Sequence, residues 1–208
     1  RSLIHPRIVS LKKKGAASYD SASMNLREML SIMVREAGRG RTIARIHSGD
    51  PALYGAIREQ MIRLERKKIP YEVIPGVSSV FAAAAALKRE LTVPELAQSV
   101  ILTRVSGRTK VPDRESLLRL ARSQSTMAIF LSADQIERVA KELRTAYPAA
   151  TPVAVVYRAS WPDEKIITGT LATIASRVRK AAIKRHALIL VGRALGDEKT
   201  GSPSSKLY

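Results

Sequence analysis

The sequence of 208 residues contains no cysteine, which excludes a disulfide framework and cysteine-ligated zinc. The absence also fits a reducing compartment, and we expect a cytoplasmic location. No apolar run approaches the roughly 18 residues of a membrane-spanning helix, and no secretory signal is visible. The sequence begins at Arg1 without a methionine, so the missing signal carries little weight.

Aromatic and acidic residues are both scarce. Aromatic residues make up 4% of the chain, too few for the stacking platforms that bind single-stranded nucleic acids. No zinc finger, basic zipper or RNA-recognition signature is present. Lys and Arg total 36 against 18 for Asp and Glu, a net charge of +18. This charge favours anionic partners. General surface basicity, an anionic small molecule and nucleic-acid binding all stay open as its explanation.

The sequence also lacks the common catalytic motifs. It has no G-x-S-x-G elbow, no Walker A loop and no G-x-G-x-x-G. The three histidines, at positions 5, 47 and 186, lie far apart and lack ligand spacing, so we predict no metal site. An enzyme with this sequence would carry its chemistry on a cofactor.

The segments that are present alternate between strands and helices, which predicts an α/β fold. Apolar residues make up 45% of the chain, a typical globular value. Pro94 marks a linker, so we expect an N-terminal α/β domain over 1–95, a C-terminal α/β domain over 96–196 and a polar tail over 197–208. The first sheet should be mainly parallel and the second mixed. The predicted strands are 42–47, 71–74, 98–105, 126–132, 152–157, 165–168 and 186–191.

The stretch over residues 45–79 holds two loops, each placed after a predicted strand. The first reads SGDP from Ser48, and the second reads PGVSS from Pro75. Open α/β sheets bind ligands at the carboxyl ends of their strands, and Gly49 can adopt a positive φ beside a ligand. A helix is expected directly after Pro51. Each loop alone is equally well explained as a helix cap; the pair together favours a pocket.

Several blocks of sequence, in this order, resemble the tetrapyrrole methylase family over nearly the whole chain. They are HSGDPALYGAIREQ, PYEVIPGVSSVFAAAAAL, ELTVPELAQSVILTRVSGRTKVP, TMAIFLS, PVAVVYRASWPDEKIITGTL and HALILVGRAL. The TR-x-x-GRT-x-VP loop is most similar to the branch that methylates precorrin-4 at C-11 in cobalamin biosynthesis. The resemblance implies S-adenosylmethionine as methyl donor, two α/β domains with the cofactor in the cleft between them, and a homodimer.

The resemblance also implies cofactor contacts, many of them through the backbone, which suits small and apolar residues. Ala159 stands where relatives often have glycine. The implied cofactor-binding residues are Ser48, Gly49, Asp50, Leu53, Ser78, Ser79, Leu131, Ala159 and Ala187.

The implied substrate is an anionic tetrapyrrole, precorrin-4 or cobalt-precorrin-4, so basic side chains near the site are candidates for binding it. These are Arg104, Arg108 and Arg158. Arg108 is favoured because it lies in the branch-specific loop and a guanidinium can bind a carboxylate bidentately. Tyr54, beside the first loop, completes the substrate candidates. No catalytic base is assigned.

Relatives carry a further strand and a G-x-G-P-G-D-P loop ahead of the segment that Arg1 opens, and this sequence does not contain them. The sequence is either a fragment or the product of a shortened reading frame, and we expect the N-terminal sheet to lack a central strand. The alternative functions are methylation at another ring position, a basic nucleic-acid-binding or interaction module, and an inactive remnant.

Overall fold

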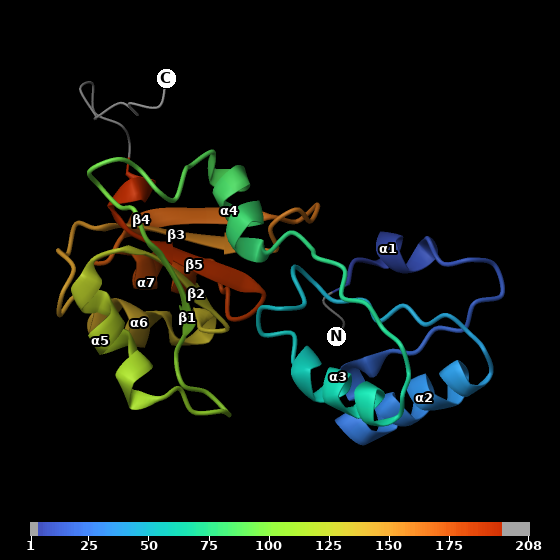
Figure 1. The fold of residues 1–208 in the computed structure, drawn as a ribbon. Helices are drawn as coiled ribbons and strands as arrows, with labels where there is room; N and C mark the ends of the chain where they lie inside the picture. Colours follow the sequence, from blue (N-terminus) through green and yellow to red (C-terminus); the bar gives the residue numbers. More distant parts are fainter. Residues whose placement is uncertain (1–3, 197–208) are drawn as a thin grey trace. The chain divides into compact units, whose positions relative to one another are not determined.

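The computed structural model describes residues 4–196, so the predicted polar tail over 197–208 lies outside the described residues. The chain divides into two compact units, Arg1–Ser78 and Ser79–Tyr208. Helices and strands both contribute (Figure 1), which confirms the α/β class.

The second unit is built on a five-stranded sheet of β1 (Val100–Arg104), β2 (Thr126–Phe130), β3 (Pro152–Tyr157), β4 (Lys165–Thr170) and β5 (Ala187–Val191). The strand order is β1-β2-β5-β3-β4. β1 and β2 are parallel, whereas β5 is antiparallel to both β2 and β3, and β4 is antiparallel to β3. The sheet is therefore mixed, as the sequence predicted.

Helices cover both faces of this sheet (Figure 1). On one face, the small side chains of α4 (Ser79–Leu87) pack against Ala128 and Leu190. On the other, α5 (Leu117–Leu120), α6 (Ile136–Leu143) and α7 (Ile174–Lys180) cover Ile129 and Ile189. Successive side chains of a strand point to opposite faces, so strands covered on both sides are apolar throughout. Short 3-10 helices complete the unit: Asp113–Glu115, Ala121–Ser123, Ala133–Gln135 and Arg193–Leu195.

The boundary between the units differs from the expected one. The contacts separate the chain between Ser78 and Ser79, not after residue 95. Two observations explain the difference. The alanine-rich α4 packs on the second unit's sheet, and the expected linker is itself built into that unit, because the Thr126 hydroxyl donates to the Leu91 carbonyl oxygen at 2.8 Å.

The first unit contains α1 (Pro6–Ser10), a 3-10 turn (Ser21–Ser23), α2 (Leu26–Gly38) and α3 (Ile57–Arg66). A capping box starts α2: the Asn25 side chain accepts from the Glu28 amide at 3.0 Å, and the Glu28 carboxylate accepts from the Asn25 amide at 2.9 Å. The helices α2 and α3 pack together, and each buries a leucine, Leu30 and Leu64.

The strands predicted over 42–47 and 71–74 do not form. Within residues 4–196, neither segment pairs with another in a backbone ladder, and the apolar side chains of Ile43, Ile46 and Ile74 are exposed. An apolar run becomes a strand only when a neighbouring chain satisfies its N–H and C=O groups. The prediction of these two strands, and of a βαβ arrangement in the described part of the first unit, was wrong.

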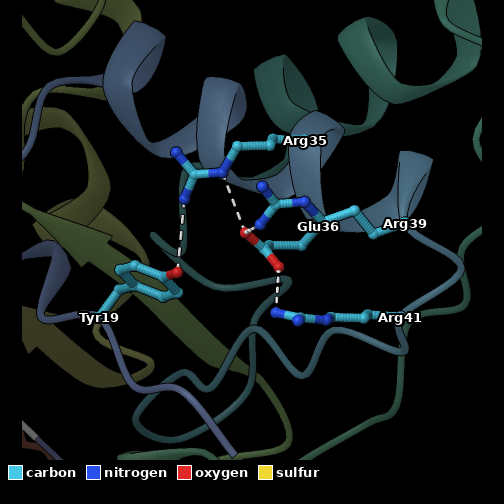
Figure 2. A network of polar contacts seen from close by, with 5 residues as sticks. All are labelled: Tyr19, Arg35, Glu36, Arg39 and Arg41. Atoms are coloured by element: carbon cyan, nitrogen blue, oxygen red, sulfur yellow. Dashed lines mark hydrogen bonds and ion pairs between the residues drawn. The ribbon is translucent and has the colours of Figure 1, made fainter.

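A buried carboxylate joins the end of α2 to the segment that follows it (Figure 2). Glu36 is 6% exposed, and its carboxylate accepts hydrogen bonds from Arg35 at 3.0 Å, Arg39 at 3.2 Å and Arg41 at 2.7 Å. Arg35 also donates to the Tyr19 hydroxyl at 3.4 Å. The hydrogen bond from Arg35, with the charges of the other arginines, holds the pKa of Glu36 below its usual value. Arg41 is thereby anchored where the chain leaves α2 toward the SGDP loop.

Candidate functional site

The SGDP loop is a tight turn organised by its own aspartate. Gly49 has a φ of +66°, in the left-handed region that glycine adopts without strain. The Asp50 carboxylate accepts from the Ala52 amide at 2.8 Å, and the Asp50 carbonyl oxygen accepts from the Leu53 amide at 3.2 Å.

The helix after this loop begins later than predicted. Pro51 lies in a turn, and α3 starts only at Ile57. Between them, Tyr54 and Ala56 have φ angles of +56° and +51°, which interrupt a right-handed helix. Gly55 lies so close to Pro51 that a Cβ there would be 2.1 Å from the proline carbonyl oxygen. The prediction of a helix directly after Pro51 was wrong because this compact turn intervenes.

The two loops of the first unit are fastened to each other. The second oxygen of the Asp50 carboxylate accepts from the Gly76 amide at 2.9 Å. A Cβ on Gly76 would be 2.2 Å from the Gly49 carbonyl oxygen, so only glycine permits this approach. The hydrogen bonds from Gly76 and Ala52 hold the pKa of Asp50 below its usual value. We call this arrangement the Asp50 clasp.

The clasp is a feature that the sequence did not predict. Asp50 was expected to contact the cofactor. Both of its carboxylate oxygens already accept from the backbone, and each keeps a further lone pair. Gly76 was not among the predicted site residues. Its signal in the sequence was a glycine at the start of the PGVSS loop, which alone does not reveal what it approaches.

The remaining first-loop candidates differ in exposure. Ser48 is exposed, Leu53 is half-buried and the Tyr54 side chain is 43% exposed. Ser78 is buried directly before α4, and Ser79, the first residue of α4, is half-buried.

In the second unit, the sheet register brings the predicted residues to one edge. Leu131 directly follows β2, and Ala187 begins β5, where it pairs with Tyr157 at the end of β3. Arg104, the last residue of the parallel neighbour β1, pairs with Phe130. Because β5 runs opposite to β2 and β3, its first residue lies beside their last ones. Leu131, Ala159, Ala187, Arg104, Arg108 and Arg158 thus lie on or directly beyond this one edge.

Leu131 is the most exposed of these apolar residues. Its side chain is 69% exposed and its φ is +53°, in the left-handed region. Ala187 is partly buried against the core that α5, α6 and α7 cover. Ala159 is partly buried against the core on the α4 face of the sheet. A positive φ at a non-glycine residue is a strained backbone conformation, and such residues cluster at ligand sites.

Arg158 is held by its own loop. Its guanidinium lies 5.2 Å from the Tyr157 ring centroid and 4.8 Å from the Trp161 ring centroid, and it forms an ion pair with Asp163 at 2.5 Å. Such stacking and pairing stabilise the loop conformation. The predicted substrate-binding role of Arg158 therefore competes with contacts already made inside the unit.

Arg104 and Arg108 differ in whether their side chains are already bonded. The Arg104 guanidinium donates to the backbone and side chain of the loop that follows β1, including the Thr109 carbonyl oxygen at 3.0 Å. The Arg108 side chain is exposed and makes no hydrogen bond or ion pair with any of residues 4–196. Of the predicted substrate-binding arginines, Arg108 alone is unengaged among these described residues.

Residues 4–196 contain no cluster of three or more His, Asp or Glu side chains that could hold a metal ion. None of the helices in this range is long and apolar enough to cross a membrane. An apolar cavity of about 380 Å³ lies between α4 and β1, and none of the predicted site residues lines it; Val80, Phe81, Leu91, Val100 and Leu102 do so.

Comparison with known proteins decides the family. Residues 1–175 match the profile of the Tetrapyrrole (Corrin/Porphyrin) Methylases. The chain belongs to this family. The resemblance inferred from the sequence blocks is thereby confirmed.

Among curated relatives, a methylase named cobalt-precorrin-4 C(11)-methyltransferase from Methanocaldococcus jannaschii is 51% identical over the whole chain, which spans 80% of that relative. One named precorrin-4 C(11)-methyltransferase from Pseudomonas aeruginosa is 46% identical over 91% of the chain and 75% of its own length. The crystal structure of a cobalt precorrin-4 methyltransferase of cobalamin biosynthesis has a TM-score of 0.92 and 46% identity, covering 94% of this chain and 82% of its own. The crystal structure of uroporphyrin-III C-methyl transferase from Thermus thermophilus, complexed with S-adenyl homocysteine, has a TM-score of 0.68 and 28% identity. The match covers 82% of this chain and 74% of the Thermus thermophilus chain.

Proposed function

We propose that this tetrapyrrole methylase transfers a methyl group from S-adenosylmethionine to C-11 of precorrin-4 in cobalamin biosynthesis. The observation that carries the proposal is 51% identity, over the whole chain, to a relative named for this reaction on the cobalt-containing substrate. The Thermus thermophilus relative, which was crystallised with S-adenyl homocysteine, supports the identity of the methyl donor.

The residues present fit such a donor. Ser48 and Gly49 are exposed and have little or no side chain, which leaves room for a ligand beside their backbone. The Asp50 clasp holds that backbone in one conformation, so little ordering would be needed on binding. Leu131 offers an apolar surface. We assign the donor contacts to Ser48, Gly49, Asp50, Leu53, Ser78, Ser79, Leu131, Ala159 and Ala187.

The chemistry needs no catalytic triad or metal. S-adenosylmethionine supplies an electrophilic methyl group on a sulfonium, and an electron-rich ring carbon of the substrate is the nucleophile. The protein aligns the two and excludes water. The substrate is a polycarboxylate, and the exposed Arg108 guanidinium is suited to bidentate carboxylate binding. Tyr54 and Arg158 stay further candidates for substrate contact.

A titration tests the proposal directly. Purified protein is titrated with S-adenosylhomocysteine by calorimetry, and separately with a DNA duplex at several salt concentrations. Saturable cofactor-product binding with little salt dependence, followed by methyl transfer to precorrin-4, is expected. Tight, salt-sensitive duplex binding without S-adenosylhomocysteine binding would instead support a nucleic-acid-binding module. Binding of neither ligand would support an inactive remnant.

Cobalt-precorrin-4 is a second candidate substrate. It is favoured because the 51% identical relative and the crystal structure with a TM-score of 0.92 are both named for the cobalt form, whereas the Pseudomonas aeruginosa relative, at 46% identity, is named for precorrin-4. Parallel assays with both substrates, with the methylated product identified by mass spectrometry, give the ratio of kcat/KM that decides between them.

We also propose a homodimer in the cytoplasm. The support is the family resemblance together with the absence of cysteine, which fits a reducing compartment. Light scattering coupled to size-exclusion chromatography measures the oligomeric state: a mass of twice 22.8 kDa is expected.

A further inference from the structure

Arg104 closes β1, and its guanidinium lies over the loop that follows. One terminal nitrogen donates to the carbonyl oxygens of Val105 at 3.3 Å and Thr109 at 3.0 Å. The other donates to the Thr109 hydroxyl at 2.9 Å and the Lys110 carbonyl oxygen at 3.3 Å. Each terminal nitrogen thus makes two hydrogen bonds, which engages all of its hydrogens and leaves only the Nε–H. The side chain that the sequence suggested for substrate binding has no terminal N–H to offer a carboxylate.

The same loop is closed by two further hydrogen bonds. The Ser106 hydroxyl accepts from the Val111 amide at 3.0 Å, and the Gly107 amide donates to the Thr109 carbonyl oxygen at 3.3 Å. The first residues of the loop connect to the sheet, because the buried Ser132 hydroxyl accepts from the Val105 amide at 3.1 Å. Residues 105–111 therefore form an internally bonded loop attached to the sheet edge, with Arg104 as its most connected member.

This bonding leaves two cations at the tip of the loop. The side chains of Arg108 and Lys110 are exposed, and neither makes a hydrogen bond or an ion pair with the described part of the chain, residues 4–196. Both belong to the loop beyond the sheet edge that carries Leu131 and Ala187. Two unneutralised cations on a bonded loop suit a ligand with more than one carboxylate.

We propose that Arg104 is a positioning residue, which holds the loop so that Arg108 and Lys110 bind carboxylates of the tetrapyrrole. Arg104 acts through the loop and does not contact the substrate. The inference rests on the proposed function for the identity of the ligand, and on the hydrogen bonds for the role of Arg104. It replaces our expectation that Arg104 binds substrate directly.

The role requires an arginine. The two terminal nitrogens of the planar guanidinium reach acceptors on Val105, Thr109 and Lys110 at once. A lysine ammonium presents all its donors from a single nitrogen. Arg104→Lys therefore keeps the charge and removes the fork. Arg119→Lys is the matched control, because Arg119 is exposed on α5 and its side chain makes no hydrogen bond within residues 4–196.

The first test does not depend on activity. Hydrogen–deuterium exchange is followed in a peptide covering residues 105–111 in the free protein. We expect roughly tenfold faster exchange in Arg104→Lys, with the wild-type rate in Arg119→Lys and unchanged exchange in β2 and β5 of both variants. An unchanged loop in Arg104→Lys would overturn the proposal, even if the enzyme is active.

The second test concerns the substrate. We expect Arg104→Lys to raise KM for the tetrapyrrole roughly tenfold, with kcat and the affinity for S-adenosylhomocysteine little changed. Adding Arg104→Lys to a variant that carries both Arg108→Ala and Lys110→Ala should raise KM no further, because Arg104 acts through Arg108 and Lys110. The positioning role would be overturned if Arg104→Lys alone left KM unchanged, or if it raised KM by the same factor in the combined variant as in the wild-type protein. Absence of methyl transfer by the wild-type protein would overturn the proposed function instead, and leave the exchange result to decide the loop.

Discussion

At the scale of single residues, the contact between the two loops of the first unit depends on one carboxylate and one glycine. Asp50 accepts from the backbone of both loops, and Gly76 permits their approach. The SGDP and PGVSS motifs alone do not show that these two residues meet. The sequence placed a glycine and an aspartate in strand-end loops, and the fold brought those loops together.

The Asp50 clasp makes the stability of the first unit pH-dependent. Because the pKa of Asp50 is held below its ordinary value of 3.8, its contribution is fully present above that value and is lost as the pH falls through the lowered native pKa. Asp50→Asn should lower the urea midpoint at neutral pH, since its side chain replaces one of the two accepting oxygens with an amide nitrogen that only donates, so the Ala52 and Gly76 amides lose one acceptor.

Urea titrations from neutral to acidic pH measure this effect. The difference in urea midpoint between the wild-type protein and Asp50→Asn should become smaller as the pH falls. Asp113→Asn is the control, because Asp113 is exposed and its side chain makes no hydrogen bond in the described range. A difference that is independent of pH would contradict the role of the clasp.

Gly76→Ala tests the loop contact itself. The added Cβ would lie 2.2 Å from the Gly49 carbonyl oxygen, so the two loops must separate. If both loops contact the methyl donor, as we propose, we expect the affinity for S-adenosylhomocysteine to fall by at least about tenfold in calorimetric titration. Gly38→Ala is the control, since nothing lies within 4 Å of a Cβ there. Equal affinities in the two variants would remove the clasp from the binding site.

At the scale of elements, burial decided which predictions held. The strands of the second unit lie close to their predicted bounds, and the apolar residues of the central strands β2, β3 and β5 are covered on both faces. In the first unit, the segments over 42–47 and 71–74 have no ladder partner within residues 4–196, and their large apolar side chains are exposed. The alanine-rich helix α4 packs closely on the sheet of the second unit.

The close packing of α4 gives a prediction at this scale. Ala83 is fully buried against the sheet, whereas Ala85 is exposed on the same helix. Ala83→Leu should destabilise the protein by about 1–3 kcal/mol, because a close-packed core must shift to accept the larger side chain. Ala85→Leu should change stability by less than about 0.5 kcal/mol. Chemical denaturation of both variants compares them; equal losses would mean that α4 is not closely packed.

At the scale of the whole molecule, the two units differ in how their backbones are satisfied. The second unit has a continuous sheet with a core on each face. The first unit relies on two packed helices, the capping box of Asn25, the Glu36 cluster and the Asp50 clasp. The family assignment rests on 175 matched residues that include both units.

This difference predicts unequal protection from hydrogen exchange. Amides in 42–47 and 71–74 lack ladder partners among the described residues and should exchange at least roughly a thousandfold faster than those of β2, β3 and β5. Exchange measured by mass spectrometry on the intact chain gives the comparison. Comparable protection would show that the two segments are paired in solution.

The sequence by itself determined the family, the α/β class and the second-unit strands, because these follow from the order of motifs and from long apolar runs. It also placed the candidate loops, since strand-end glycines and hydroxyls are visible locally. Only the tertiary structure decided that Asp50 binds Gly76, that Arg104 holds its own loop and that α4 belongs to the second unit. Each of these depends on which distant backbone groups meet, and hydrogen bonds between groups far apart in the chain leave no periodic signal in the sequence.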